Sequence, residues 1–300
     1  MKHLLKLLDC STEDIIGLLD LADQLKYEKK HNISHRHLEG KSLGMIFQKS
    51  STRTRVSFET GMYQLGGQAL FLSNRDLQIG RGEPVQDTAR VLSRYLDGIM
   101  IRTYKQSEVD ALAQNGTIPI INGLTDFAHP CQVLADLMTI REHKGSLDGL
   151  KMCFIGDGNN MMNSLIVGCL KMKMEVAVAC PNDYKPNAMV LDFAVQHPAF
   201  SITNDPKEAA RGADVVITDV WASMGQEEQK RREAFQGFQV NDEIMSVAKP
   251  DAMVQHCLPA HRGEEITAEI LEKHSTEIFD EAENRLHAQK AVLVKLLGRK

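Results

Sequence analysis

Short apolar runs alternate with longer amphipathic runs along most of this 300-residue chain, and the alternation limits its fold more than any other feature. Short apolar runs are typical of buried strands, whereas apolar residues that recur once per helical turn are typical of helices. The pattern predicts strands at 42–48, 68–73, 98–102, 118–122, 151–156, 175–180, 214–220 and 253–258. It predicts helices at 12–26, 53–65, 84–95, 106–115, 129–143, 160–172, 187–196, 226–236 and about 281–298. Alternating strands and helices predict an α/β fold with parallel sheets flanked by helices.

The periodic pattern is interrupted at Lys144–Gly149, where turn-forming residues are concentrated. Chains of this length typically form about two domains. We therefore expect one domain at 1–145 and a second at 146–300, each a parallel β-sheet flanked by helices. The terminal helix, at about 281–298, is long, and we expect it to pack back on the first domain and link the two halves.

Composition and charge exclude several classes of function. The net charge is −5, whereas nucleic-acid-binding proteins present a basic face. No apolar run approaches the ~20 residues that a membrane span requires. The six cysteines form no CxxC pair and mostly lie in apolar runs, which is typical of buried thiols in a reducing cytoplasm. We therefore expect a cytoplasmic protein with no nucleic-acid or membrane partner.

Two patterns bear on metals and cofactors. His31, His35 and His37 cluster in a polar stretch that fits a solvated linker better than a metal site. Gly156-Asp157-Gly158 follows an expected strand, as in a dinucleotide-binding loop, but Met161 stands where that motif has its third glycine. The chain also lacks the GxxxxGK(S/T) phosphate loop. We therefore expect no metal and no cofactor.

The strongest local signal is Ser50-Ser51-Thr52-Arg53-Thr54-Arg55, which follows an expected strand and opens an expected helix. Hydroxyl and guanidinium groups are concentrated there. A helix N-terminus adds backbone N–H donors and partial positive charge, and arginine binds phosphate through paired hydrogen bonds. The segment also fits a helix cap followed by solvated arginines, although a cap does not need two arginines. We expect an anion site with phosphate as its ligand.

Four segments, taken in order, resemble the motifs of the aspartate/ornithine carbamoyltransferase family. They are Ser51–Arg55, His129–Gln132, Asp219–Gly225 and His256–Ala260. The resemblance continues to Glu283-Asn284-Arg285, so it covers essentially the whole chain. Ser-Met-Gly in the third segment and His-Cys-Leu-Pro in the fourth resemble the ornithine branch, since the aspartate branch typically has His-Pro-Leu-Pro-Arg in the fourth. The resemblance implies transfer of a carbamoyl group from carbamoyl phosphate to the δ-amine of L-ornithine.

The resemblance also implies which residues bind carbamoyl phosphate. They are Ser51, Thr52, Arg53, Thr54, Gln78, Arg102, His129, Gln132, Cys257, Leu258 and Arg285. Arg102, His129 and Thr54 would polarise the carbamoyl carbonyl, while Gln132 and the Leu258 carbonyl would hold its amide. Gln78 would reach the phosphate of a neighbouring subunit, which implies a shared site and a homotrimer or a multiple of trimers. By residue type alone, Arg102 also fits a surface charge and His129 a capping or core histidine.

The ornithine side is expected to use Asn160, Asp219, Ser223 and Met224. Ornithine carries an α-carboxylate and two amines, so its site needs both donors and an acceptor for ammonium, and Asp219 can be that acceptor. The resemblance places Cys257 beside the reacting amine, paired with Asp219, and makes it catalytic together with Arg102 and His129. Other readings are a turn residue for Asp219, a helix cap for Asn160 and an inert buried thiol for Cys257.

Three alternative functions stay open at this point. A related carbamoyltransferase would use putrescine, aspartate or N-acetylornithine. A nicotinamide-dependent dehydrogenase is supported by Gly156-Asp157-Gly158 alone. A binding module without catalysis would have kept the architecture and lost turnover. One departure from the ornithine branch is Phe127-Ala128 before His129, where a Glu-Phe pair is frequent, and it affects local packing more than chemistry.

Overall fold

Two parts of the chain each carry one parallel β-sheet, which confirms the predicted α/β class. A computed structural model describes residues 1–75, 77–78, 82–222 and 228–298. Unit 1 contains Met1–Ala135 and Arg285–Lys300, and unit 2 contains Asp136–Asn284. The sequence predicts a boundary at 145/146, whereas the structure divides within α5 (Pro130–Lys144). Periodicity does not mark this division, because α5 continues through it without a break.

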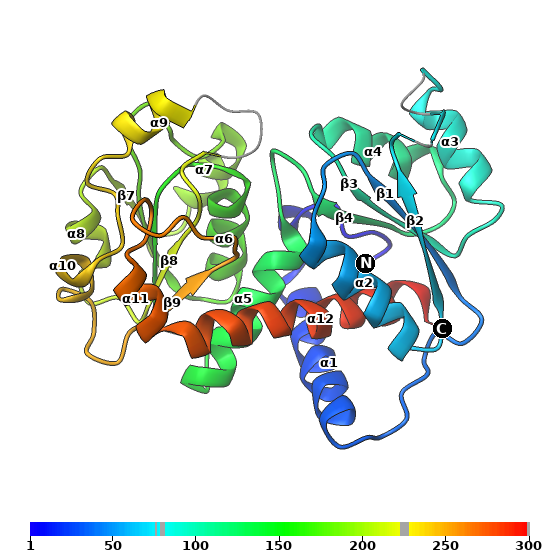
Figure 1. Ribbon diagram of the computed structural model, residues 1–300, viewed down its shortest axis with the longest axis horizontal. Coiled ribbons are helices and arrows are strands. Elements are labelled where there is room, and N and C mark those ends of the chain that lie inside the picture. Colours follow the sequence, from blue (N-terminus) through cyan, green and yellow to red (C-terminus); the bar gives the residue numbers. More distant parts are fainter. Residues whose placement is uncertain (76, 79–81, 223–227, 299–300) are drawn as a thin grey trace. The chain divides into compact units, whose positions relative to one another are not determined.

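Unit 1 is built on a parallel sheet with strand order β2-β1-β3-β4 (Figure 1). Before α5, its elements in chain order are η1 (Leu7–Asp9), α1 (Thr12–Lys30), β1 (Ser42–Phe47), α2 (Thr52–Gln64), β2 (Gln68–Ser73), α3 (Val85–Leu92), β3 (Gly98–Arg102), α4 (Gln106–Asn115) and β4 (Ile120–Leu124). The end of α12 (Ser275–Leu297) also belongs to unit 1.

The core of unit 1 follows from the alternation of side chains along its strands. Ile99 and Ile101 of β3, two residues apart, point to the same face and pack with Val109 and Leu112 of α4. A second contact lies between α2 and α12, where a Cβ added at Gly61 would be 3.2 Å from Lys290 Cγ. The small residue at position 61 therefore lets α12 approach α2 closely.

Unit 2 is built on a parallel sheet with strand order β7-β6-β5-β8-β9. Its further elements are β5 (Lys151–Ile155), α6 (Asn160–Lys171), β6 (Glu175–Ala179), α7 (Ala188–Ala194), β7 (Phe200–Thr203), α8 (Pro206–Ala210), β8 (Val215–Thr218), α9 (Glu228–Ala234), α10 (Asp242–Met245), β9 (Met253–His256) and α11 (Ala268–Lys273). Its core joins Cys153 and Ile155 of β5 to Val216 of β8 and to Ile270 and Leu271 of α11. The apolar strand runs therefore lie inside, as the sequence pattern indicates.

Most expected elements are present, with shifts of a few residues at their ends. The structure adds short elements that the periodicity did not predict, namely β7, α8, α10 and α11. The strand expected at 253–258 ends at His256, because Leu258 has a φ of 55° and so leaves the extended conformation. Among the described residues, no helix has the length and apolar character needed to cross a lipid bilayer.

Candidate active site

Polar residues follow the carboxyl ends of parallel strands in both units. In unit 1, Ser51 comes after β1, Arg102 ends β3 and His129 comes after β4. In unit 2, Asp219 comes after β8 and Cys257 comes after β9. Parallel strands end at the same edge of their sheet, and ligands of open α/β sheets bind there. Each unit therefore gathers chemically active side chains at one edge of its own sheet.

Ser51 shapes the first turn of α2. It is the N-cap residue: its hydroxyl oxygen accepts from the Thr54 backbone N–H at 3.2 Å, and its hydroxyl donates to Thr54 Oγ1 at 3.1 Å. Thr54 is buried, Thr52 is exposed and Arg53 is partly exposed. The turn therefore offers the donors of a helix N-terminus together with hydroxyl and guanidinium groups, which suits an anion.

Arg285 of α12 is buried and hydrogen-bonded within unit 1. Its Nη1 donates to Gln132 Oε1 at 2.6 Å, and its Nη2 donates to Thr54 Oγ1 at 3.2 Å. A guanidinium group only donates hydrogen bonds, so both oxygens are suitable partners. The structure thus brings together Thr54, Gln132 and Arg285, which the sequence predicts for the site from three distant segments.

His129 is buried, and its surroundings keep its imidazole neutral. Burial lowers the pKa of His129 well below its ordinary value, and the positive charges of Arg285 and Arg102 lower it further. The ring is therefore uncharged at neutral pH, with one nitrogen as donor and the other as acceptor. Such a ring donates a hydrogen bond to a carbonyl oxygen without adding a positive charge.

Sequence reasoning missed Lys49 and Asp126, which form an ion pair at this edge of unit 1. Lys49 Nζ lies 2.7 Å from Asp126 Oδ1 and 4.5 Å from the centre of the Tyr104 ring. The backbone N–H groups of Gln48 and Lys49 donate to the Arg102 carbonyl at 2.9 and 3.4 Å. Hydrogen bonds to Arg102 and an ion pair with Asp126 therefore hold the loop before Ser51 in place. The available signal was a lysine directly before the hydroxyl-rich run, but a solvated lysine gives the same signal.

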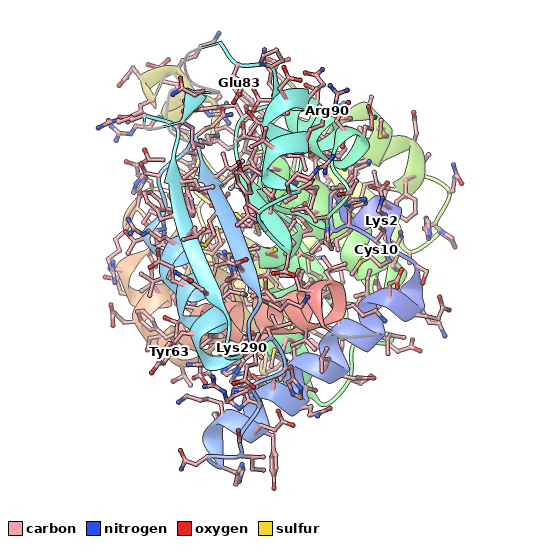
Figure 2. The ribbon with its side chains drawn as sticks, turned by 90° about the vertical axis from the view of Figure 1, so that its right-hand side faces the viewer. Lys2, Cys10, Tyr63, Glu83, Arg90 and Lys290 are labelled. Carbon is pink, nitrogen blue, oxygen red and sulfur yellow. The ribbon has the colours of Figure 1, made fainter. Side chains whose placement is uncertain are left out.

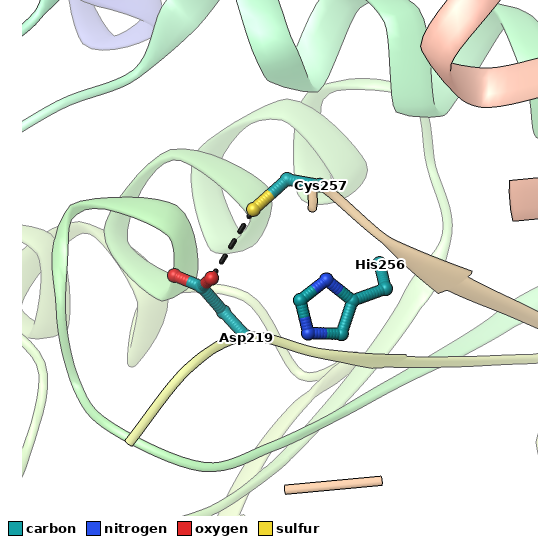
Figure 3. A group of neighbouring side chains, drawn as sticks. All are labelled: Asp219, His256 and Cys257. Atoms are coloured by element: carbon teal, nitrogen blue, oxygen red, sulfur yellow. Dashed lines mark hydrogen bonds between the residues drawn. The ribbon is translucent and has the colours of Figure 1, made fainter. Parts of the chain in front are cut away.

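Asp219 and Cys257 face each other in unit 2 (Figure 3). The thiol of Cys257 donates to Asp219 Oδ1 at 3.1 Å, and Asn159 Nδ2 donates to Asp219 Oδ2 at 2.8 Å. The Val220 backbone N–H also donates to Asp219 Oδ1, at 2.8 Å. Because Asp219 is buried, these three donors hold its carboxylate in one orientation.

Asn159, which the sequence prediction did not include, donates one of the hydrogen bonds to Asp219. It is the N-cap of α6, and its side-chain oxygen accepts from the backbone N–H groups of Met161 and Met162. Asn160, which was predicted, is the first helical residue and is partly exposed. Two adjacent asparagines after a strand carry the same sequence signal, so only the structure distinguishes the cap from its neighbour.

The thiol of Cys257 is held in its protonated form. Burial raises the pKa of Cys257 well above its ordinary value, and the carboxylates of Asp219 and Glu281 add to the rise. The hydrogen bond to Asp219 has the same effect, because it is made only by the protonated thiol. Cys257 is therefore a hydrogen-bond donor at neutral pH rather than a thiolate base or nucleophile.

His256 anchors the turn that carries Cys257 and Leu258. Its Nδ1 accepts from the Leu258 backbone N–H at 2.9 Å, and its Nε2 donates to Glu265 Oε1 at 3.0 Å. The His256 backbone N–H donates to Glu281 Oε2 at 3.1 Å. Leu258, Glu265 and Glu281 are buried or partly buried, so these hydrogen bonds hold the turn after β9 at the edge of the sheet.

Possible metal-ligand atoms also lie within 4.8 Å of one another in Asp219, His256 and Cys257. Hydrogen bonds already use these atoms: the thiol donates to Asp219, and both ring nitrogens of His256 have partners. A metal ion would have to break these bonds and displace the thiol proton. The hydrogen bonds of these three side chains therefore argue against their being a set of metal ligands.

The remaining predicted residues lie as follows. Leu258 is partly buried directly after Cys257. Gln78 is exposed between β2 and α3, and its backbone carbonyl accepts from the Glu83 N–H at 3.1 Å. Ser223 and Met224 lie outside the described residues.

Close packing accounts for Gly158, the second glycine of the segment that resembles a dinucleotide loop. A Cβ added at Gly158 would lie 2.2 Å from the carbonyl carbon of Lys185 and 2.4 Å from the nitrogen of Pro186. The Gly158 N–H donates to the Tyr184 carbonyl at 2.8 Å. Gly158 is therefore required by the approach of another backbone segment of unit 2, and its presence is no argument for a nicotinamide cofactor.

Comparison with protein families finds two matches, one after the other along the chain. Residues 2–142 match the family model described as aspartate/ornithine carbamoyltransferase, carbamoyl-P binding domain. Residues 148–296 match the model described as aspartate/ornithine carbamoyltransferase, Asp/Orn binding domain. Together the two matches cover most of the chain.

Proteins named ornithine carbamoyltransferase are similar to this chain over its full length. A protein of Syntrophotalea carbinolica named ornithine carbamoyltransferase is 57% identical over 300 residues, which cover 99% of this chain and 99% of that protein. A protein of the same name from Carboxydothermus hydrogenoformans is 55% identical over 304 residues, which cover 99% and 98%. The solved structure of ornithine carbamoyltransferase from Pyrococcus furiosus has a TM-score of 0.95 at 51% identity, and the match covers 100% of this chain and 98% of that one.

We expect the Cys257 thiol to stay protonated through the neutral pH range. Because its pKa is raised, its thiolate forms only above the pH at which an ordinary cysteine ionises. The thiolate ultraviolet absorbance of the wild type minus that of Cys257→Ser should therefore stay flat from about pH 6 to about pH 9. A titration step in that range that disappears in Cys257→Ser would contradict the assignment.

Proposed function

The chain belongs to the aspartate/ornithine carbamoyltransferase family, and we propose that it transfers the carbamoyl group of carbamoyl phosphate to the δ-amine of L-ornithine, giving L-citrulline and phosphate. The observation that carries the choice of amine is the buried Asp219 carboxylate beside the Cys257 thiol. A buried carboxylate attracts a cationic amino acid and repels the extra carboxylate of aspartate. The names of the full-length relatives support the same choice.

Carbamoyl phosphate is assigned mainly to unit 1, which contains nearly all of the segment that matches the carbamoyl-P binding domain. The assigned residues are Ser51, Thr52, Arg53, Thr54, Gln78, Arg102, His129, Gln132 and Arg285, with Cys257 and Leu258 from unit 2. The N-terminal turn of α2 supports phosphate binding through its donors and its arginine. Arg285 adds a buried positive charge, which favours a dianionic ligand.

Ornithine is assigned to unit 2, whose sequence matches the Asp/Orn binding domain. The assigned residues are Asn160, Asp219, Ser223 and Met224. Asp219 accepts from an ammonium group of ornithine, and its orientation is supported by the hydrogen bonds from Asn159 and Cys257. We add Asn159 as a positioning residue for Asp219, since it holds the second carboxylate oxygen.

The reaction is a direct attack of the neutral δ-amine on the carbamoyl carbon. The new C–N bond forms, the C–O bond to phosphate breaks, and the departing phosphate takes the proton that the nitrogen loses. Arg102, His129 and Thr54 stabilise the oxyanion that develops on the carbonyl oxygen. The neutral state of His129 fits this role, because a neutral imidazole donates a hydrogen bond and leaves the positive charge to Arg102. Binding two small substrates in line supplies much of the remaining rate enhancement.

The δ-amine must be neutral before it can attack. A primary alkyl amine titrates near ~10.4, so roughly one molecule in 10³ is neutral near pH 7.4. The raised pKa of Cys257 excludes its thiolate as the base at this pH. Asp219 and Cys257 therefore act by orienting ornithine, with Asp219 as the acceptor for an ammonium group and the Cys257 thiol as the donor to that carboxylate.

The working form is proposed to be a homotrimer, or a multiple of trimers, in which Gln78 serves the site of a neighbouring subunit. The β2 patch, defined here as Val56, Tyr63, Leu70 and Phe71, supports an interface between copies. Tyr63 on α2 (Figure 2) is 80% exposed. Leu70 and Phe71 are exposed on β2, the edge strand of its sheet. An exposed apolar edge strand is a template for pairing with another chain. The six free cysteines fit a reducing compartment such as the cytoplasm.

The first test is product formation from carbamoyl phosphate with ornithine, putrescine, aspartate and N-acetylornithine offered side by side. We expect the purified protein to form citrulline and to favour ornithine strongly. Preference for another amine would overturn the assignment of Asp219 and would leave the carbamoyl phosphate half intact. An absence of turnover with every amine would overturn the transferase proposal as a whole.

Arg53→Ala should raise the KM for carbamoyl phosphate by about 10- to 100-fold, because hydrogen bonds to charged groups contribute roughly 1.5–3 kcal/mol. The KM for ornithine, measured at saturating carbamoyl phosphate, should change much less. Arg90→Ala is a suitable control, since Arg90 is an exposed arginine of the same unit that pairs with Asp87. An unchanged KM for carbamoyl phosphate in Arg53→Ala would refute the phosphate assignment.

Phe71→Asp should separate the subunits, because a charge in the β2 patch would be buried at the interface. Light scattering should give about three times the chain mass of 33.5 kDa, or a multiple of that value, for the wild type and about one chain mass for the variant. Activity should fall on dissociation, since each site would lose Gln78 of the partner subunit. Met189→Asp introduces the same charge at an exposed apolar residue of unit 2 and should leave the mass unchanged. A wild type that is monomeric at assay concentration would exclude the shared site.

A further inference from the structure

Gln289, one turn after Arg285 on α12, has no role in the function described so far, although it is fully buried. Its amide oxygen accepts from Arg285 Nη2 at 2.9 Å and from Arg285 Nε at 3.2 Å, and its amide nitrogen donates to Ser57 Oγ at 2.5 Å. This orientation of the amide follows from its neighbours, because a guanidinium group has donors only and must face the oxygen. Gln289 therefore links α12 to α2 through a polar contact inside unit 1.

Ser57 passes this link to the first turn of α2. Its hydroxyl lies 2.6 Å from the Arg53 carbonyl and 3.2 Å from the Thr54 carbonyl, and it donates to them. The hydroxyl hydrogen is thus directed to the backbone, which leaves a lone pair of the Ser57 oxygen for the Gln289 amide. The backbone of Arg53 and Thr54 is in this way tied to Gln289.

Arg285 contacts both Gln289 and the first turn of α2. The guanidinium that donates to Gln289 also donates to Thr54 Oγ1 at 3.2 Å and to Gln132 Oε1 at 2.6 Å. Gln289 and Arg285 hold α2 at two points, one through Ser57 and the other through the side chain of Thr54. We call the set Arg285, Gln289 and Ser57 the α12–α2 relay.

The relay restricts groups that would otherwise have several orientations. An arginine side chain has many rotamers, and ordering it costs conformational entropy. Gln289 holds Nε and Nη2 together, so it restricts the plane of the guanidinium as well as its position. Sites for small anions depend on such restriction, since displacements of about 1 Å can lower rates about 100-fold.

We propose that Gln289 is a positioning residue for carbamoyl phosphate, which holds Arg285 and the first turn of α2 in one fixed relation. It does not touch the substrate and acts through Arg285, Arg53 and Thr54. The proposal rests on the function proposed above, because those residues are assigned there to carbamoyl phosphate. Gln289 is thus a further residue of the phosphate half of the site, and it acts through α12 and α2.

The test compares Gln289→Met with Lys290→Met. Lys290 is the next residue of α12, is equally buried, and is hydrogen-bonded to His35 and Gln64 instead of to the relay. Both changes replace a buried polar side chain by an apolar one of similar length. Gln289→Met should raise the KM for carbamoyl phosphate by about tenfold, the effect of losing a hydrogen bond to a buried charge, and change the KM for ornithine less than about twofold. Lys290→Met should lower the melting temperature and leave both KM values within about twofold.

Ser57→Ala tests the other end of the relay with a smaller structural change. It should raise the KM for carbamoyl phosphate in the same direction, and Ser57→Ala combined with Gln289→Met should cost less than the two single effects multiplied, because both remove the same link. Equal effects of Gln289→Met and Lys290→Met on the KM for carbamoyl phosphate would overturn the proposal. So would fully multiplicative effects in the double variant.

Calorimetric titration with inorganic phosphate separates this proposal from the proposed function. If the wild type forms no citrulline, the proposed function fails, and phosphate binding still tests the relay. Weaker phosphate binding by Gln289→Met than by Lys290→Met would then support Gln289 as a positioning residue of the anion site. Equal phosphate binding by the two variants would overturn it whether or not the wild type turns over.

Discussion

The candidate site of unit 1 depends on the hydrogen bonds made by the buried guanidinium group of Arg285. A buried cation without partners is strongly unfavourable, so its surroundings must supply acceptors. They do so from α2, α5 and α12, through Thr54, Gln132 and Gln289. The same charge helps to keep His129 neutral. The positions of three helices and the ionisation state of a histidine thus depend on one side chain.

The candidate site of unit 2 has the opposite arrangement, in which hydrogen-bond donors surround a buried carboxylate. Asp219 needs donors, and it receives them from Asn159, Cys257 and the Val220 backbone. One consequence is chemical, because the thiol must keep its proton to donate, and its pKa is raised accordingly. Unit 1 therefore presents positive groups and unit 2 presents a carboxylate, which matches one anionic and one cationic substrate.

Much of the fold was predictable because it is encoded locally. The expected strands 68–73 and 98–102 and the expected helix 106–115 coincide with β2, β3 and α4. Each is bounded by residues that end the pattern and is long enough to show its period. The segments β7 and α10, which were missed, have only four residues each, and so few positions do not distinguish a strand or helix from a loop.

The candidate site divides in the same way between local and long-range information. The sequence by itself determined that the segment with Ser51 opens a helix after a strand, and that Arg102, Asp219 and Cys257 lie at strand ends, because apolar runs and helix starts are properties of neighbouring residues. Only the tertiary structure decided that Asn159 donates to Asp219, and that Gln289 holds Arg285. It also decided that His129 is neutral and that Cys257 is a thiol. Partners and ionisation states depend on burial and on charges from distant segments, which only the folded chain brings together.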